Sequence, residues 1–247
     1  MSKNTMNLFG KTVLTGSLLA SVSMVQAEGP FDASANVALT TDYVYRGFTQ
    51  TDDGIAIQGG FDLEHETGFY IGTWGSNVKF LENNTVKPED RADIEIDLYG
   101  GYRGKLNKQF SYDLKAGHYM YPGAGSHLNY DTNEFNVTFT YNMPQGTEVS
   151  VLYDYSPDFF GRDDSHHYKL ALNHTLASSL SFGGHVGKQF LTDNKAAGYD
   201  DFIYYGLSLS YPIADFDVSV DYSNTDLDNA DNFGADDRVF LTLSKTL

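Results

Sequence analysis

The sequence predicts an all-β protein, a transmembrane antiparallel up-and-down β-barrel of about 12 strands. Three observations support this fold class. Apolar and polar residues alternate along the chain, short and long connections alternate between the strands, and aromatic residues gather at the strand ends. The composition agrees, because the chain has 24 Gly, 18 Tyr and 17 Phe but only 6 Pro, and aromatic residues favour strands.

The alternation is clearest in residues 92–103, ADIEIDLYGGYR. Asp93, Glu95 and Asp97 alternate there with aliphatic residues, and a period of two places the acids on one face of a strand. The same pattern recurs along the chain and leaves no helical stretch after the N-terminal region. The predicted strands lie within residues 35–47, 57–64, 69–76, 92–103, 110–116, 134–141, 148–155, 168–173, 180–189, 203–211, 216–223 and 239–244.

The connections between these strands follow a second pattern. The short ones are residues 66–68, 104–108, 142–146, 176–179 and 212–215. The longer, more polar ones are residues 79–91, 122–132, 157–165, 191–200 and 225–237, with the compact residues 49–54 as an exception. Outer-membrane barrels have short periplasmic turns and longer outer loops. We therefore expect both chain termini on the periplasmic side.

Aromatic residues on the apolar faces form two groups. Those beside the short turns are Phe69, Tyr102, Phe110, Tyr141, Tyr211 and Phe216. Those near the long loops are Tyr43, Tyr45, Tyr155, Tyr168, Phe190 and Tyr222. Two aromatic girdles around an aliphatic band are typical of a barrel in a membrane. The apolar faces are therefore predicted to face lipid and the polar faces the lumen.

The N-terminus has the pattern of an export signal. Lys3 and Lys11 precede an apolar stretch, residues 13–25, and the small-residue cleavage pattern ends at Ala27. We predict a signal peptide over residues 1–27, followed by an outer-membrane barrel over residues 28–247. The apolar stretch is too short and too rich in Ser for a membrane anchor. The chain has no Cys, which excludes disulfides and thiolate metal sites.

Several short segments resemble a known family. They are the tract from Ser34 to Gly47, Gln58-Gly59-Gly60, Gly72-Thr73-Trp74, Glu95-Ile96-Asp97 and the terminal Ser244-Lys245-Thr246-Leu247. On these residues the chain resembles the TorF porin family, proteobacterial exported proteins first catalogued as conserved hypothetical. The likeness spans the mature chain and is strongest in its first third. The resemblance implies an outer-membrane β-barrel with a pore role and supplies no catalytic residue.

The polar faces give a mainly acidic lumen. The candidate pore-lining residues are Asp42, Arg46, Asp62, Glu64, Asp93, Glu95, Asp97, Arg103, Asp113, Lys115, Glu134, Glu148, Asp154 and Lys169. An acidic wall attracts cations and repels anions. The sequence therefore predicts a porin-like channel for small polar or cationic solutes, with no catalytic residue, metal or cofactor. Expected partners are outer-membrane lipid, lipopolysaccharide and small solutes, whereas the net charge of −17 disfavours nucleic acid. The oligomeric state stays open.

Two alternatives remain open at this point. About eight strands give a filled barrel and about sixteen an aqueous channel, so twelve strands also fit a closed structural or adhesive barrel. In that case Arg46, Arg103 and Lys115 would pair with the acids in a salt-bridged plug. The second alternative is a barrel enzyme acting on lipid or peptide at the outer rim. Its candidate groups are Asp163, Asp164, His166 and His167 in the rim loop, and His118 and His174 near strand ends.

The last long connection is rich in acids. Asp226, Asp228, Asp231, Asp236 and Asp237 lie within TDLDNADNFGADD. Oxygen-rich loops hold calcium, but this one lacks the EF-hand spacing. A solvated acidic loop is the favoured interpretation.

Overall fold

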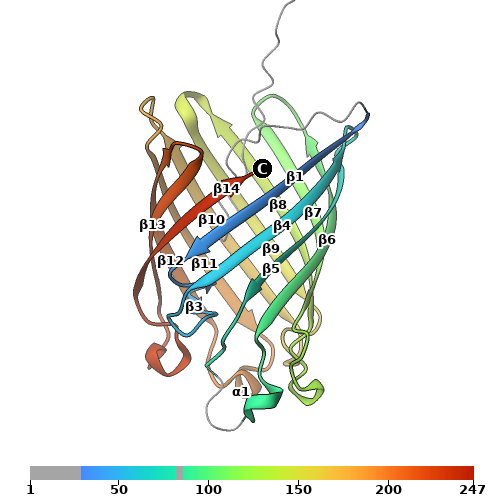
Figure 1. The fold of residues 1–247 in the computed structure, drawn as a ribbon, viewed down its shortest axis with the longest axis vertical. Helices are drawn as coiled ribbons and strands as arrows, with labels where there is room; N and C mark the ends of the chain where they lie inside the picture. Colours follow the sequence, from blue (N-terminus) through green and yellow to red (C-terminus); the bar gives the residue numbers. More distant parts are fainter. Residues whose placement is uncertain (1–28, 82–85) are drawn as a thin grey trace, which may run out of the picture.

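A computed structural model describes residues 29–81 and 86–247. Strands β1 and β4 to β14 form a closed barrel in which each strand pairs with its neighbours in the chain, and β14 closes the ring on β1 (Figure 1). All pairs are antiparallel, and closure runs from Asn36 opposite Thr246 to Thr40 opposite Thr242. The predicted twelve-stranded antiparallel barrel is confirmed. The predicted signal peptide, residues 1–27, lies outside the described residues.

The barrel strands are β1 (Phe31–Thr40), β4 (Ala56–His65), β5 (Phe69–Asn77), β6 (Ile94–Lys105), β7 (Phe110–Met120), β8 (Thr132–Met143), β9 (Thr147–Ser156), β10 (Ser165–Thr175), β11 (Ser181–Leu191), β12 (Phe202–Ile213), β13 (Phe216–Thr225) and β14 (Arg238–Thr246). The smaller elements are the hairpin strands β2 (Val44–Tyr45) and β3 (Phe48–Thr49), the short helix α1 (Asn194–Ala197) and the 3-10 turns η1 (Pro88–Asp90), η2 (Ser126–Leu128), η3 (Pro144–Gly146) and η4 (Ala230–Phe233). In the part of the chain that the structure describes, no helix is long and apolar enough to cross a membrane.

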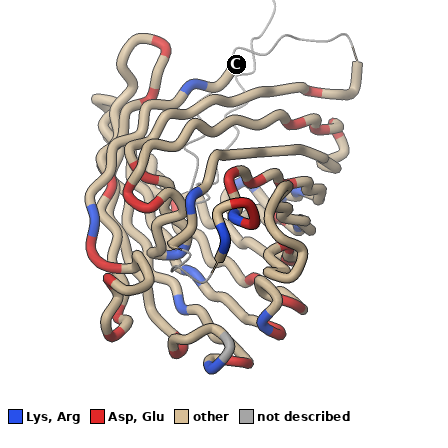
Figure 2. The backbone as a smooth tube through the Cα atoms, turned by 60° about the horizontal axis from the view of Figure 1, so that its bottom comes forward, with Lys and Arg blue, Asp and Glu red and all other residues tan. Residues whose placement is uncertain are grey.

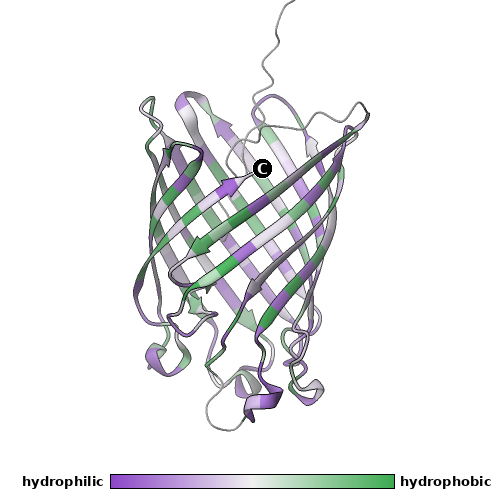
Figure 3. Cartoon of the chain, viewed as in Figure 1, coloured by the Kyte–Doolittle hydropathy of each residue, from purple (hydrophilic) through white to green (hydrophobic). Residues whose placement is uncertain are grey.

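The two faces of each barrel strand differ as the alternation predicts. On β8, Phe135 is 52% exposed while its neighbour Glu134 is 2% exposed. On β12, Leu207 is 64% exposed while Tyr204 is 2% exposed. Figure 3 shows the resulting alternation of apolar and polar residues along the strands. Because every strand turns its aliphatic side outward, the barrel has an apolar outer wall and a polar interior.

Short turns and long loops lie at opposite ends of the barrel. The end that carries the short turns also carries the start of β1 and the C-terminus (Figure 1, top). Leu247 there exchanges backbone hydrogen bonds with Ala35. The long loops and helix α1 lie at the other end, which we call the long-loop end.

The first predicted strand, residues 35–47, is wrong in its second half. Strand β1 ends at Thr40, and residues 41–55, which we call the inner segment, fold into the barrel. The inner segment contains the hairpin β2–β3, whose turn residues Arg46 and Gly47 have φ of 49° and 92°. The β1–β4 connection is therefore a long one, and residues 49–54 are not the compact exception that the sequence suggested.

Tyr43 and Tyr45 are consequently not part of an outer aromatic girdle. Tyr43 is 9% exposed and packs in an interior cluster with Val78 and Tyr121, and Tyr45 packs against that cluster. The physical reason is the bend after β1, which breaks the alternation of faces. A carboxylate in the bend, from Asp42, collects hydrogen bonds from within the inner segment and holds the segment back on itself. The other outer aromatic residues, such as Phe69 at 63% and Tyr168 at 49% exposed, lie on the outer wall.

Candidate functional site

Arg46 anchors the inner segment across the lumen, in the half of the barrel nearer the long loops. Its guanidinium donates to Glu134 on β8 at 2.7 Å and to Asp154 on β9 at 3.1 Å. It also donates to the Gln189 side chain on β11 at 2.8 Å. Gly47, next along the chain, approaches β13, because a Cβ built there would lie 2.4 Å from Thr225 Cγ2. The hairpin therefore spans the lumen rather than lying against one wall.

A second ion cluster fixes the base of the inner segment. The Asp42 carboxylate accepts hydrogen bonds from Thr49 at 2.6 Å and Thr51 at 2.9 Å. It also accepts from Arg238 at the start of β14, at 2.9 Å. The same guanidinium binds Asp53 at 2.8 Å. Both ends of the inner segment are thus tied to the last barrel strand.

Buried carboxylates face the lumen beside the inner segment on β6. Glu95 is 3% and Asp97 is 9% exposed, and Glu95 Oε2 and Asp97 Oδ1 have no hydrogen-bond partner. Tyr43 and Tyr121 lie within hydrogen-bonding reach of Glu95. Both tyrosines lie outside the barrel strands, and burial raises the pKa of each well above its ordinary value. They therefore stay protonated and donate. Asp93, the third acid of this series, is exposed and precedes β6.

His167 on β10 belongs to the same buried hydrogen-bond network as Arg46 and Asp154. His167 Nδ1 lies 2.5 Å from Asp154 Oδ2, and His167 Nε2 lies 2.8 Å from the Tyr204 hydroxyl. Asn136 also contacts Asp154 closely. His166 points the other way, to the outer wall, where its Nε2 is 3.5 Å from Asp164. The two histidines proposed as rim-enzyme groups therefore lie on opposite faces of the strand and do not form one acid–base unit.

A third cluster occupies the short-turn half of the lumen. Arg103 on β6 pairs with Glu64 at 2.7 Å and with Asp113 at 3.1 Å. Its guanidinium lies 3.9 Å from the centre of the Tyr70 ring, whose hydroxyl donates to Asp113 at 2.6 Å. Arg103 keeps 40% of its side chain exposed, against 7% for Arg46. The short-turn half is therefore more open to water than the half that holds the inner segment.

The remaining predicted lining residues, apart from Asp93, are spread along the barrel strands. Asp62 accepts from the Tyr99 hydroxyl at 2.9 Å, and Lys115 Nζ lies 5.7 Å from the centre of the Tyr99 ring. Lys169 on β10 is buried, and Glu148 on β9 is half-buried. The structure thus joins Arg46 with Glu134 and Asp154, and Arg103 with its two acids. It brings Asp93 to neither cluster.

Two acids of the loop after β13 have partners within the protein. Asp226 accepts the backbone N–H of Ile203 at 2.6 Å, and Asp236 pairs with Arg238 at 2.7 Å. Over residues 29–81 and 86–247, no three His, Asp or Glu side chains are placed to hold one metal ion. Acidic segments are also frequent in other long loops, as Figure 2 shows with this end turned forward.

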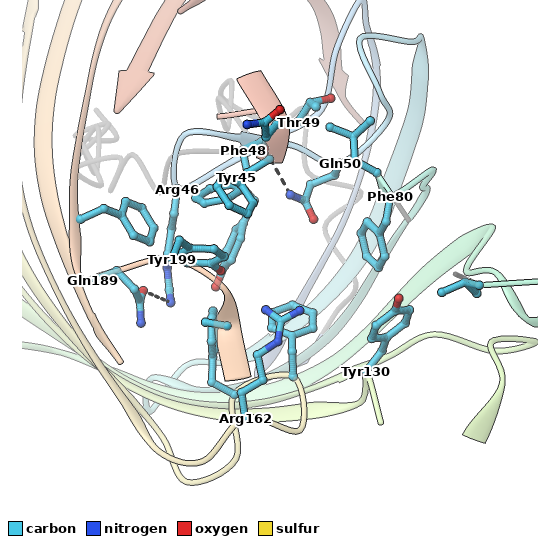
Figure 4. A pocket seen from close by; sticks show the side chains of 18 residues that line it. Tyr45, Arg46, Phe48, Thr49, Gln50, Phe80, Tyr130, Arg162, Gln189 and Tyr199 are labelled. Carbon is cyan, nitrogen blue, oxygen red and sulfur yellow. Dashed lines mark hydrogen bonds between the residues drawn. The ribbon is translucent and has the colours of Figure 1, made fainter. Parts of the chain in front are cut away.

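A cavity of about 360 Å³, which we call the mouth chamber, lies between the inner segment and the long loops (Figure 4). Every long loop contributes to its walls. The lining residues are Tyr45, Arg46, Phe48, Thr49, Gln50, Phe80, Leu81, Val86, Tyr130, Phe159, Phe160, Arg162, Gln189, Ala197, Tyr199, Phe202, Asn232 and Phe233. The wall is therefore mainly aromatic, with a few amide and guanidinium groups.

Residues 24–247 match the Gcw_chp family, described as a bacterial protein of unknown function. The chain belongs to the Gcw_chp family. No curated protein matches it.

Among solved structures, this Gcw_chp barrel is similar to a KdgM porin (TM-score 0.58, 12% identity, covering 86% of this chain and 98% of the porin). A KdgM porin in complex with disordered oligogalacturonate gives a TM-score of 0.59 at 13% identity, with the same coverage. A NanC porin gives 0.56 at 11% identity, covering 87% of this chain and 98% of the porin. At such identities the likeness establishes a shared fold.

Several interior residues of the site were not predicted from the sequence. Arg238 has the same position parity as Thr242 and Ser244 on the polar face of the last strand, so extending the predicted strand by one residue, from 239 to 238, would have found it. By parity, Gln189 and Tyr204 lie on the polar faces of their predicted strands, but the sequence does not mark them as site residues. Their importance depends on the position of Arg46, which no local pattern gives.

Proposed function

We propose that this protein is an outer-membrane channel for small polar solutes, in which an acidic inner wall favours cations over anions. The observation that carries the proposal is a closed twelve-stranded barrel with an apolar outer wall and a charged, hydrogen-bonded interior. Such a barrel leaves no backbone edge unpaired in hydrocarbon. The shared fold with KdgM and NanC porins supports the same function.

Export to the outer membrane is part of the proposal. The signal pattern of residues 1–27 accounts for transport out of the cytoplasm, and the resemblance to the TorF porin family accords with the destination. The expected surroundings are outer-membrane lipid and lipopolysaccharide. The proposed function needs no catalytic residue and no cofactor.

The cation preference rests on the excess of interior acids. In the short-turn half, Asp62, Glu64 and Asp113 face the single guanidinium of Arg103 and the ammonium of Lys115. Near the inner segment, Glu95 and Asp97 each keep an oxygen without a hydrogen-bond partner. A negative wall of this kind lowers the energy of a cation in the lumen and raises that of an anion.

The inner segment acts as the gate in this proposal. It is attached to the barrel by β1 and β4 and fixed in the lumen by polar contacts of Arg46 and Asp42. These are side-chain contacts and not part of the pairing between barrel strands, so the segment can leave the lumen without breaking any barrel strand pair. The short-turn half, with its more exposed charges, then continues the path.

A closed structural barrel is the second candidate. It is favoured by one observation, the burial of the Arg46 anchor, whose side chain is 7% exposed and whose partner Gln189 is 0% exposed. Planar bilayer recording separates the two functions. A channel gives discrete conductance steps and a reversal potential of cation-selective sign in a KCl gradient. A closed barrel stays silent at every voltage and salt concentration, which would contradict the channel proposal.

A further inference from the structure

The mouth chamber has two aromatic walls. On one side, Phe48 of the inner segment packs with Tyr199 at 5.2 Å and with Phe202 at 5.1 Å between ring centres. On the other side, Phe80 packs with Tyr130 at 5.4 Å. Figure 4 shows Tyr199 and Tyr45 on one side and Phe80 and Tyr130 on the other, with open space between them. A flat molecule that enters the chamber therefore meets ring faces on two sides.

Polar groups lie between these walls. Gln189 is 0% exposed, its Oε1 accepts from Arg46, and its Nε2 has no hydrogen-bond partner. A buried donor without a partner is unfavourable, and a ligand oxygen that reaches Nε2 after a small movement of the Gln189 side chain removes this penalty. Gln50 donates from Nε2 to the Phe48 carbonyl at 3.2 Å, which leaves its Oε1 as an acceptor beside the chamber.

The charged groups of the chamber wall disfavour direct contact with a cationic ligand. Its lining within the described residues contains Arg46 and Arg162 and no Asp or Glu. Arg46 is neutralised by Glu134 and Asp154 behind the wall. Arg162 has no carboxylate partner among the residues that the structure describes. A cation at this position would approach guanidinium groups without a compensating acid.

The loops around the chamber oppose an anionic ligand. They contain many acids and few bases, and the acids include Asp158, Asp163, Asp164, Asp193, Asp200 and Asp201. Their summed field repels anions from the mouth at moderate ionic strength. A neutral ligand avoids both penalties. It also has to offer hydroxyl groups, because the chamber presents donors and acceptors together.

We propose that the mouth chamber binds a neutral carbohydrate of one or two rings. The C–H face of a sugar ring packs on aromatic rings, while its hydroxyls accept from Gln189 Nε2 or the Arg162 guanidinium and donate to Gln50 Oε1. A cavity of about 360 Å³ is within the range of about 300–1,000 Å³ found for small-molecule sites. The inference deepens the proposed function, on which it rests, by naming the solute class that the mouth selects.

Saturation-transfer NMR on the purified protein in detergent micelles tests this site with maltose as the probe. We expect saturable binding to the wild type. The dissociation constant should rise about tenfold in Arg162→Gln and in Tyr199→Leu, as expected for loss of a charge-assisted hydrogen bond or a ring contact. The matched controls are Lys188→Gln and Tyr205→Leu, whose side chains lie on the outer wall, and both should bind maltose as the wild type does.

Charge selectivity is tested with three sugars of one ring. Glucose should bind more tightly than glucosamine, which adds a cation, and more tightly than glucuronate, which adds an anion. Absence of saturable maltose binding would overturn the inference. So would equal binding by the chamber variants and the wild type, or tighter binding of either charged sugar. Tyr199 packs in a cluster of aromatic rings, so its replacement can prevent folding. If Tyr199→Leu does not fold, the result for Arg162→Gln decides the test.

The channel and the sugar site fail separately in this design. Conductance is recorded without sugar, and sugar binding is measured in micelles without a membrane potential. A conducting protein that ignores maltose disproves only the carbohydrate site. A silent protein that binds maltose disproves only the channel.

Discussion

Arg46 Nη2 lies 2.7 Å from Glu134 Oε1, although the two residues are 88 positions apart in the chain. This contact joins the tip of the inner segment to β8. The inner segment therefore occupies the half of the lumen nearer the long loops. It is also almost dry, with 7% and 3% of the two side chains exposed. A buried ion pair of this kind fixes both side chains in one position. Removing one partner leaves the other as a buried charge without a counter-ion.

Replacing Arg46 with Gln should open the channel and weaken the fold. Glu134 and Asp154 lose their common cation, and breaking a buried pair in this way costs about 3–5 kcal/mol. We expect larger or more frequent conductance steps in planar bilayers and a lower urea midpoint for unfolding. The control is Lys79→Gln, because Lys79 pairs with Asp52 at 2.5 Å but remains 67% exposed. Wild-type gating in Arg46→Gln would show that the anchor does not hold a gate.

A reversible covalent lock tests the gate directly, since the chain has no Cys of its own. A Cβ built on Gly47 lies 3.1 Å from Tyr204 Cβ, so the two positions have to separate by a few tenths of an ångström to reach the about 3.5–4.5 Å usual in disulfides. The double variant Gly47→Cys/Tyr204→Cys should conduct poorly when oxidised and recover with dithiothreitol. The positive φ of Gly47, 92°, adds strain of about 1–3 kcal/mol, so folding is checked in the reduced form.

The two single-Cys variants are the controls for this lock, and neither should respond to dithiothreitol. Equal conductance of the oxidised and reduced double variant would mean that ions pass without movement of the inner segment.

Ion selectivity should depend on Glu95 and Asp97 but not on Asp93. The first two are buried and face the lumen, whereas Asp93 is exposed and precedes β6. These two carboxyl groups face water once the inner segment leaves the lumen, so the double variant Glu95→Gln/Asp97→Asn should move the reversal potential in a KCl gradient towards zero. Asp93→Asn should leave the reversal potential unchanged. The reverse ranking, with Asp93 dominant, would place the conduction path outside the barrel interior assigned to it.

Much of the barrel could be predicted because its determinants are local. Alternation along a strand decides which side chain faces outward, and neighbours such as Leu207 and Ser208 differ as the pattern requires. The alternation of short and long connections then predicts which end of the barrel carries the short turns. These features need no knowledge of distant residues, and they gave the strand number, the orientation of the faces and most pore-lining candidates.

The inner segment could not be predicted because its determinants are distant. The alternation of Tyr43 and Tyr45 continues through the point where the chain leaves β1, so parity alone extends the strand. The partners of Arg46 come from β8, β9 and β11, and no local pattern brings them together. A polar pair, Asp42 and Arg46, followed by Gly47 was the available signal that this strand ends early.

Orientation in the membrane is tested by placing charge on the outer wall. Leu207 is 64% exposed near the middle of β12, and an Arg on the lipid face near the bilayer midplane costs about 2–4 kcal/mol. Leu207→Arg should therefore fold poorly into lipid vesicles, as measured by the fraction that migrates as folded protein on unheated gels. Ser208→Arg, one residue along and facing the lumen, should fold nearly as well as the wild type because its charge reaches water. If Leu207→Arg folds fully and Ser208→Arg does not, the apolar wall does not contact lipid and the channel proposal loses its physical basis.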